Sequence, residues 1–179
     1  MEREGLSAAS PIEVRRLGAA DIDLYRALRL ESLRESPEAF GATLESALAR
    51  SENWWRKSVK NDLILGAFAS GELVGMARIS RKEGAKDRHK AGLTGFYVRA
   101  QARRGGVGRA LLSEAEAQAC VFAEQLLLDV AAGNHAAHAL YASCGFVEYG
   151  RAPKALKYGG LYDDEILMVK FLGVPVPKS

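Results

Sequence analysis

The sequence predicts an α/β (α+β) fold in which a mixed, mostly antiparallel central sheet carries a local parallel βαβα segment and flanking helices. Two observations lead to this prediction. In the first half, two strand-like runs flank Ser70-Gly71, which is typical of an antiparallel hairpin. In the second half, helical and apolar strand patterns alternate, which indicates parallel strands joined by helices.

The first elements follow from alternation and from a stop signal. Residues 12–17 alternate apolar and polar side chains and predict a strand, and the pattern from Asp21 to about Arg34 predicts an amphipathic helix. Pro37 ends that helix, because proline cannot continue it. A second helix is predicted over residues 44–59.

The middle of the chain resembles an antiparallel meander. Residues 62–69 and 72–79 are the two predicted hairpin strands. A highly charged connection over residues 81–90 leads to the next predicted strand, at residues 93–98. The first half of the sheet is therefore expected to be antiparallel.

The pattern changes after that strand. A glycine-rich turn precedes a predicted helix over residues 108–124, which leads to a short buried strand over 125–130 and a further helix over 134–144. Two final strands are predicted at residues 146–148 and 165–171. This second half contributes the parallel part of the sheet.

Length and charge limit the class of protein. The 179 residues include 25 Lys and Arg and 22 Asp and Glu, for a net charge of +3. We expect one domain over residues 1–179, with a core at about 12–172 and loose termini. The dispersed, nearly balanced charge argues against a nucleic-acid partner.

Targeting and cysteine patterns limit the class further. The chain begins without the basic and apolar regions of a secretion signal, and no apolar run approaches the ~18 residues that span a bilayer. We therefore expect a cytoplasmic protein with no membrane partner. Cys120 and Cys144 are the only cysteines and form no CxxC pattern, which argues against a disulfide framework or a zinc site.

The segment 98–112 carries the main chemical signal. It joins a strand end to an amphipathic helix through a loop rich in glycine and arginine. Glycines let the backbone approach a ligand closely, and a helix N-terminus presents unpaired N–H groups and a partial positive charge. Three arginines add cationic donors, namely Arg103, Arg104 and Arg109. The segment therefore predicts a phosphate or pyrophosphate site.

Two familiar phosphate-binding loops fit this segment poorly. A nucleoside-triphosphatase loop closes with Gly-Lys-Ser/Thr, but here Gly108 is followed by Arg109-Ala110. A dinucleotide-binding fingerprint is matched only in part, because Leu111 stands at its third glycine position and an antiparallel meander precedes it.

A third kind of loop fits better. Arg103-x-x-Gly106-x-Gly108 resembles the acyl-CoA loop of the GCN5-related N-acetyltransferase (GNAT) family. Further residues are similar to the family's second signature, namely Leu126, Leu128, Val130, Asn134, Ala137, Leu140, Tyr141, Gly145 and Phe146. The order of elements agrees with the family over about residues 12–172, and the resemblance implies a GNAT-like acyl-CoA N-acyltransferase fold. Residues 36–41 and 160–168 resemble a bacterial branch whose substrates are mostly undefined.

The resemblance implies that acetyl-CoA is the co-substrate. The backbone N–H groups of residues 104–109 would hold its pyrophosphate, and residues 96–98 would pair with the pantetheine arm as an added strand does. The implied cofactor-binding residues are Phe96, Tyr97, Val98, Arg103, Arg104, Gly105, Gly106, Val107, Gly108, Arg109, Asn134, Ala137 and Tyr141.

The resemblance also makes Tyr141 the general acid that protonates the leaving thiolate. The alternative role for Tyr141 is that of a core residue near the end of an amphipathic helix. Asn134 is expected to cap that helix and to reach the pantetheine as well.

Two carboxylates are candidate catalytic groups on the acceptor side. Asp129 ends the central strand where parallel strands would have to separate, and some relatives place a catalytic acid there; the alternative is a loop-capping aspartate. Glu31 falls in the apolar arc that Leu24, Ala27 and Leu28 define on the first helix. It therefore either lines an amine pocket or extends to solvent from the helix end.

Other reactive side chains are assigned simpler roles. No metal is expected, because the histidines form no ligand pattern: His89, His135 and His138. Cys144 is expected to pack as a small apolar residue, since direct transfer needs no enzyme nucleophile. One of Trp54 and Trp55 is expected to pack inward and the other to wall the acceptor site.

The predicted function is an acetyl-CoA-dependent N-acetyltransferase in which a primary amine attacks the thioester directly in a ternary complex. A backbone N–H near Val98 would polarise the carbonyl. The acceptor is expected to be a small-molecule or peptide amine, and a homodimer is left open. The alternatives are a non-catalytic acyl-CoA-binding sensor or interaction module and, with less support, a nucleic-acid module based on the charged residues 81–90.

Overall fold

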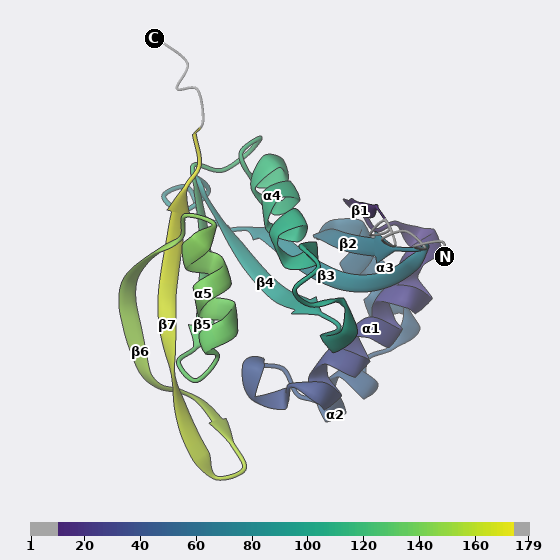
Figure 1. The fold of residues 1–179 in the computed structure, drawn as a ribbon, viewed down its shortest axis with the longest axis horizontal. Coiled ribbons are helices and arrows are strands. Elements are labelled where there is room, and N and C mark those ends of the chain that lie inside the picture. Colours follow the sequence, from purple (N-terminus) through teal and green to yellow (C-terminus); the bar gives the residue numbers. More distant parts are fainter. Residues whose placement is uncertain (1–10, 174–179) are drawn as a thin grey trace, which may run out of the picture.

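One seven-stranded sheet organises the computed structural model, which describes residues 11–173 (Figure 1). The strand order is β1-β2-β3-β4-β5-β7-β6. The strands are β1 (Ile12–Arg16), β2 (Leu63–Ala69), β3 (Glu72–Arg81), β4 (Lys90–Val98), β5 (Gln125–Ala131), β6 (Val147–Tyr158) and β7 (Leu161–Phe171). The assignment of residues 1–179 to one domain stays a prediction, and its loose ends, residues 1–10 and 175–179, lie outside the described residues.

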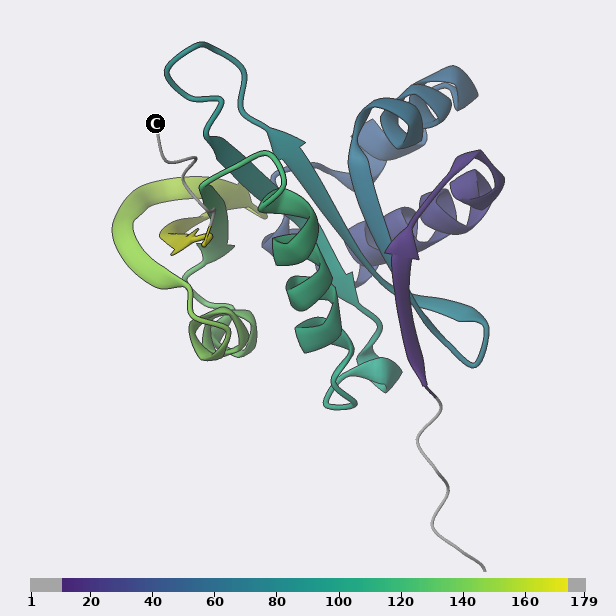
Figure 2. The same ribbon diagram turned by 90° about the horizontal axis from the view of Figure 1, so that it is seen from above.

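Five α-helices and three short 3-10 turns connect the described strands. The helices are α1 (Ile22–Glu35), α2 (Leu44–Leu48), α3 (Glu52–Asn61), α4 (Val107–Ala119) and α5 (His135–Ser143), and the turns are η1 (Ala19–Asp21), η2 (Pro37–Ala39) and η3 (Ala100–Ala102). Figure 2 shows α4 and α5 on one face of the sheet and α1 and α3 on the other. No helix within residues 11–173 is long and apolar enough to cross a membrane.

The predicted fold class is confirmed. The sheet is mixed, and its strand pairs are antiparallel except for the parallel pair β4–β5. That parallel pair lies in the predicted βαβα segment, because α4 connects the two strands.

The parallel pair is short, and this determines where the site lies. Pairing between β4 and β5 covers only Lys90–Gly92 against Gln125–Leu127. Beyond that point β4 keeps its antiparallel partner β3, with a register shift, and Gly95 adopts a φ of +59°. β5 instead follows β7. The two parallel strands therefore diverge, as Figure 1 shows.

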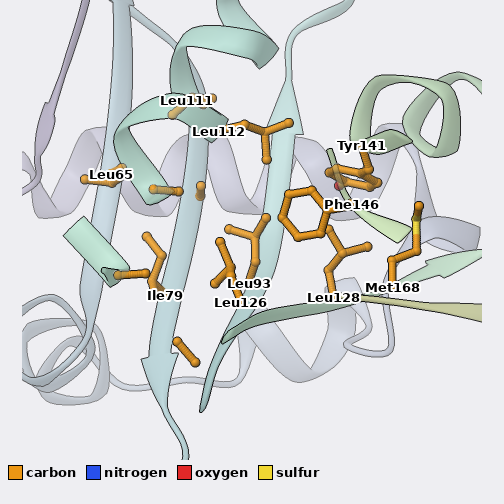
Figure 3. Close-up of a cluster of buried hydrophobic side chains, with 14 of the residues drawn as sticks. Leu65, Ile79, Leu93, Leu111, Leu112, Leu126, Leu128, Tyr141, Phe146 and Met168 are labelled. Atoms are coloured by element: carbon orange, nitrogen blue, oxygen red, sulfur yellow. The ribbon is translucent and has the colours of Figure 1, made fainter. Parts of the chain in front are cut away.

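Two apolar cores hold the helices to the sheet. The first packs α4 and α5 against the strands, and Figure 3 shows Leu111 and Leu112 above Leu93, with Tyr141 beside Phe146. The second packs α1 and α3 against the other face through residues such as Leu28, Leu33, Trp55, Ile64 and Met76. Because each core fixes one layer, α4 and α1 face the sheet from opposite sides at the point where β4 and β5 separate.

Two predicted helix boundaries were wrong. The helix predicted over 44–59 is two helices, because Ser51 caps a new one: its Oγ accepts from the Trp54 N–H at 3.2 Å. The helix predicted over 108–124 ends at Ala119, after which the chain turns and the Glu124 N–H donates to the His89 carbonyl. Local capping and the entry to β5 decide both ends.

The final strands were predicted far too short. β6 and β7 form a long hairpin around Gly159-Gly160, both at positive φ. Nearly every residue of β6 is exposed, since it is the edge strand, so the strand has no apolar alternation that a sequence reading could detect. Pairing with β7 rather than burial keeps it extended.

Candidate active site

The divergence of β4 and β5 opens a cleft of 980 Å³. Its walls come from segments far apart in sequence. They are the α1–α2 connection, the end of β4, the β4–α4 loop, the start of α5 and the hairpin. The lining residues are Ser36, Glu38, Ala39, Phe40, Phe96, Tyr97, Val98, Arg103, Arg104, Gly106, Gly108, Arg109, Ala131, Gly133, Asn134, Ala136, Ala137, Ala139, Leu140, Ser143 and Asp163.

The β4–α4 loop presents unpaired N–H groups to this cleft. Gly106 is the N-cap of α4 with a φ of +86°, and Arg104 is also left-handed, at +64°. The first backbone bond of the helix runs from the Ala110 N–H to the Gly106 carbonyl at 2.9 Å. The N–H groups of residues 107–109 therefore have no partner inside the helix and are available to an anion.

Two of the three arginines, which the sequence offers as donors to a phosphate, also form hydrogen bonds within the protein. Arg103 donates from Nε to the Val98 carbonyl at 2.9 Å, and Arg109 donates from Nη2 to Ser143 Oγ at 3.1 Å. These bonds tie the loop to β4 and α4 to α5. Arg103 therefore positions the loop, although its side chain still borders the cleft.

The end of β4 offers an open strand edge. Tyr97 and Val98 pair with Met76 and Gly75 of β3, while no β5 residue faces them in register. A strand whose second edge is unpaired can accept an extended chain through main-chain hydrogen bonds. Loop and edge together fit the phosphates and the pantetheine arm of acetyl-CoA.

Helix α5 begins and ends beside the same cleft. Asn134 caps it, because its Oδ1 accepts from the Ala137 N–H at 3.1 Å, and both residues line the cleft. Tyr141 lies deeper, 6% exposed, with its ring edge-on to Phe96 at 5.6 Å and to Phe146 at 5.9 Å (Figure 3). Within residues 11–173 its hydroxyl forms no hydrogen bond, and burial raises the pKa of this phenol.

Tyr141 thus has the environment of a core residue, but its hydroxyl proton is not used in a hydrogen bond. The cleft-lining Phe96 covers it, and Tyr141 itself is not among the lining residues. Its role as general acid stays a prediction.

Asp129 is exposed on β5 and belongs to an acidic group that the sequence analysis did not assemble. It pairs with Leu167 of β7, and Glu165 lies two residues before Leu167 on that strand. Burial raises the pKa of the Glu165 carboxyl, and the charges of Asp129 and Asp163 raise it further. No local signal reveals Glu165, because strand pairing alone brings it to Asp129.

Glu31 is held by a partner instead of pointing freely into the cleft. Arg99, just after β4, donates from Nη2 to Glu31 Oε2 at 2.8 Å and from Nε to Oε1 at 2.9 Å, and Tyr97 donates its hydroxyl at 3.4 Å. Glu31 is not a lining residue of the cleft. Its catalytic role stays a prediction, and the ion pair connects α1 to the end of β4.

The remaining candidates lie outside the cleft or at its rim. Trp55 is 1% exposed as expected, but Trp54 stacks on Trp55 and Arg50 and does not line the cleft. His138 bonds to Glu148 at 2.6 Å. Cys144 packs against the first core. Within residues 11–173 no group of three metal-ligating side chains is found.

The fold is a mixed sheet whose two parallel strands diverge at a cleft, with a helix N-terminus beside it. The chain belongs to the acetyltransferase (GNAT) family, whose model matches residues 25–146, well over half of the chain. A search of curated proteins found no significant match.

Solved structures agree with this family. A ribosomal-protein-alanine N-acetyltransferase from Brucella melitensis is 28% identical, with a TM-score of 0.77 over 89% of this chain and 99% of that one. A GNAT acetyltransferase from Streptococcus pneumoniae is 23% identical, with a TM-score of 0.82 over 91% and 100%. The yncA structure from Salmonella typhimurium, solved with its cofactor acetyl-CoA, is 18% identical, with a TM-score of 0.77 over 95% and 99%.

Proposed function

We propose that this chain transfers the acetyl group of acetyl-CoA to a primary amine by direct attack in a ternary complex. One observation carries the proposal: the unpaired N–H groups at the start of α4 and the unpaired edge of β4 border one cleft. An anion site and an unpaired strand edge on the same cleft suit a long ligand that has a pyrophosphate and an amide-containing arm.

When bound, acetyl-CoA supplies an activated acetyl group as a thioester and departs as a thiol. The backbone of residues 104–109 holds the pyrophosphate, and residues 96–98 hold the arm and aim the Val98 N–H at the carbonyl oxygen. Asn134 and Ala137 bound the arm from α5, opposite β4.

Two side chains move protons in this proposal. Asp129 takes the proton that the amine must lose before it can attack, and Tyr141 gives a proton to the departing sulfur. The support for Tyr141 is its unbonded hydroxyl and its position directly behind the cleft-lining Phe96. The support for Asp129 is its exposed position on β5 where the strands diverge.

The test is release of free thiol from acetyl-CoA with a panel of small amines and peptide N-termini, alongside calorimetry of acetyl-CoA binding. Acetyl-CoA binding together with amine-dependent thiol release is the expected result. Binding without release for every amine would instead support the non-catalytic acyl-CoA sensor. Absence of acetyl-CoA binding would overturn the proposal.

A further inference from the structure

Two arginines lie near each other beside the cleft, and the transfer chemistry proposed above does not use them. They are Arg29 of α1 and Arg78 of β3, and we call them the arginine pair. A Cβ placed on Gly95 of β4 would lie 4.0 Å from Arg29 Nη1 and 3.9 Å from the Arg78 Cβ. Both side chains therefore pack over Gly95, where β4 carries no side chain of its own.

Arg29 is partly buried yet has no acidic partner. Within residues 11–173 it forms no ion pair, and its one hydrogen bond, from Nη1 to Ser32 Oγ, is long at 3.5 Å. Burial lowers the pKa of this guanidinium, and the nearby charge of Arg78 acts in the same direction. A guanidinium placed this way is costly for the fold unless something neutralises it.

Arg78 adds a second unsatisfied group. Its Nη2 pairs with Asp62 Oδ2 at 2.9 Å, which uses the available carboxylate. Its Nε is buried without any hydrogen-bond partner, one of two such side-chain atoms among the described residues. Of the two guanidinium groups, only that of Arg78 pairs with a carboxylate, and each arginine keeps donors without an acidic partner.

The arginine pair adjoins the cleft. The Arg29 guanidinium carbon lies 4.6 Å from the centre of the Phe40 ring, and Phe40 lines the cleft. Gly95 directly precedes Phe96, another lining residue. Arg29 belongs to α1, which covers the sheet face opposite α4 (Figure 2), so the pair is separate from the site proposed for the cofactor phosphates.

The other wall of the cleft is acidic. Asp163 lines it, and Asp129 and Glu165 lie close by on β5 and β7. Carboxylates suit the ammonium form of an acceptor, whereas Arg29 and Arg78 suit an anion. An acceptor that satisfies both walls carries an amine and a negative group in one small molecule.

We infer that Arg29, supported by Arg78, binds a carboxylate of the acceptor, and that the acceptor is an amino acid or a close amino-acid analogue. This inference rests on the proposed transfer to an amine and names the class of its substrate. An unmodified peptide N-terminus and a simple polyamine both lack the α-carboxylate that the arginine pair would bind.

The test compares acceptors that differ only in charge. The probes are alanine, methionine and glutamate, each with its α-carboxamide, assayed for thiol release from acetyl-CoA. We expect at least one amino acid to exceed its carboxamide in kcat/KM by roughly 10- to 100-fold, the usual worth of a charge-assisted hydrogen bond. Arg29→Gln should reduce this ratio to about one, and Arg29→Lys should restore part of it. Arg34→Gln, an exposed arginine on the same helix, is the matched control and should keep the ratio.

The possible results separate the two ideas. Equal activity on acids and amides, or an equal loss on both in Arg29→Gln, would overturn the role of Arg29 and leave the transferase proposal intact. In the second case Arg29 would act only as a support for Phe40. Calorimetry of the amino acids on CoA-saturated protein provides a second readout. Arg29-dependent binding without thiol release would keep the anion site and remove the transferase, whereas absence of both binding and carboxylate-selective turnover would overturn the inference.

Discussion

In the proposed function, the two sides of the cleft recognise their ligands by different means. The cofactor side consists mostly of main-chain groups from one continuous stretch, the end of β4 and the loop into α4. The acceptor side consists of side chains from η2 and β7, with Asp129 of β5 and the arginine pair of α1 and β3 beside them, and these meet only in the folded chain. Main-chain recognition leaves a glycine pattern in the sequence, whereas side-chain recognition from distant segments leaves none.

The same contrast separates binding of the cofactor from selection of the acceptor. A backbone cradle depends on φ angles and on few side-chain identities, so it can serve one cofactor throughout a family. Side chains on separate elements can change one at a time without disturbing that cradle, which is how one fold takes different acceptors. Substitutions on each side should therefore fail in different ways.

The largest expected effect comes from Tyr141→Phe. Removing the hydroxyl should lower kcat by roughly 10²–10⁴-fold, the usual worth of a positioned proton transfer. The ring contacts with Phe96 and Phe146 remain, so acetyl-CoA affinity and thermal stability should stay close to the parent values. Steady-state kinetics with calorimetry measures both quantities, and an unchanged kcat would return Tyr141 to a purely structural role.

Asp129→Asn should rank second. Loss of a base should lower kcat by about 10²-fold with little change in acceptor KM, because the base acts mainly in the transition state. Steady-state kinetics at saturating acetyl-CoA measures both constants. An unchanged kcat would move the base to another group.

Gly106→Val tests the cofactor side. A bulky side chain at the cradle, together with the strain of a φ of +86°, should weaken acetyl-CoA binding by roughly tenfold for each lost backbone hydrogen bond to phosphate. Gly71→Val is the matched control, since Gly71 has a φ of +82° and open space around it in the β2–β3 turn. Equal affinities in two folded variants would show that the loop is not the phosphate site.

Glu31→Gln should have a smaller effect, and mainly on stability. It removes a partly buried bidentate pair with Arg99, which is worth about 1 kcal/mol in the free energy of unfolding. If Glu31 also contacts the acceptor amine, acceptor KM should rise while kcat stays close to the parent value. Denaturant unfolding of Glu31→Gln, Arg99→Gln and the double variant gives the coupling energy, and additive losses would show that the pair is not coupled.

Glu165→Gln should have the smallest effect and a defined pH dependence. Because burial and two neighbouring acids raise the pKa of Glu165, its charged form costs the folded state stability once pH rises through that raised pKa. The variant should therefore be slightly more stable than the parent at pH 7 and equal to it well below the ordinary glutamate pKa. Thermal melts at the two pH values measure the difference, and the opposite order would mean that Glu165 is stabilised as an anion.

The sequence by itself determined the fold class, the turn geometry of the β4–α4 loop and the helix cap at Asn134. Each depends on neighbours in the chain. Alternation defines a strand, Arg103-x-x-Gly106-x-Gly108 supplies the positive-φ turn and the free N–H groups, and an asparagine before a helix caps it.

Tertiary structure decided the rest. Edge strand β6 has no buried face, so the long hairpin left little periodic pattern to detect. Glu31 meets Arg99 across 68 positions, and Glu165 reaches Asp129 only through the pairing of β5 with β7. Arg29 stands out only because the fold places no acidic partner beside it within residues 11–173. Local sequence sets backbone geometry, whereas the balance of buried charge depends on which distant strands and helices come together.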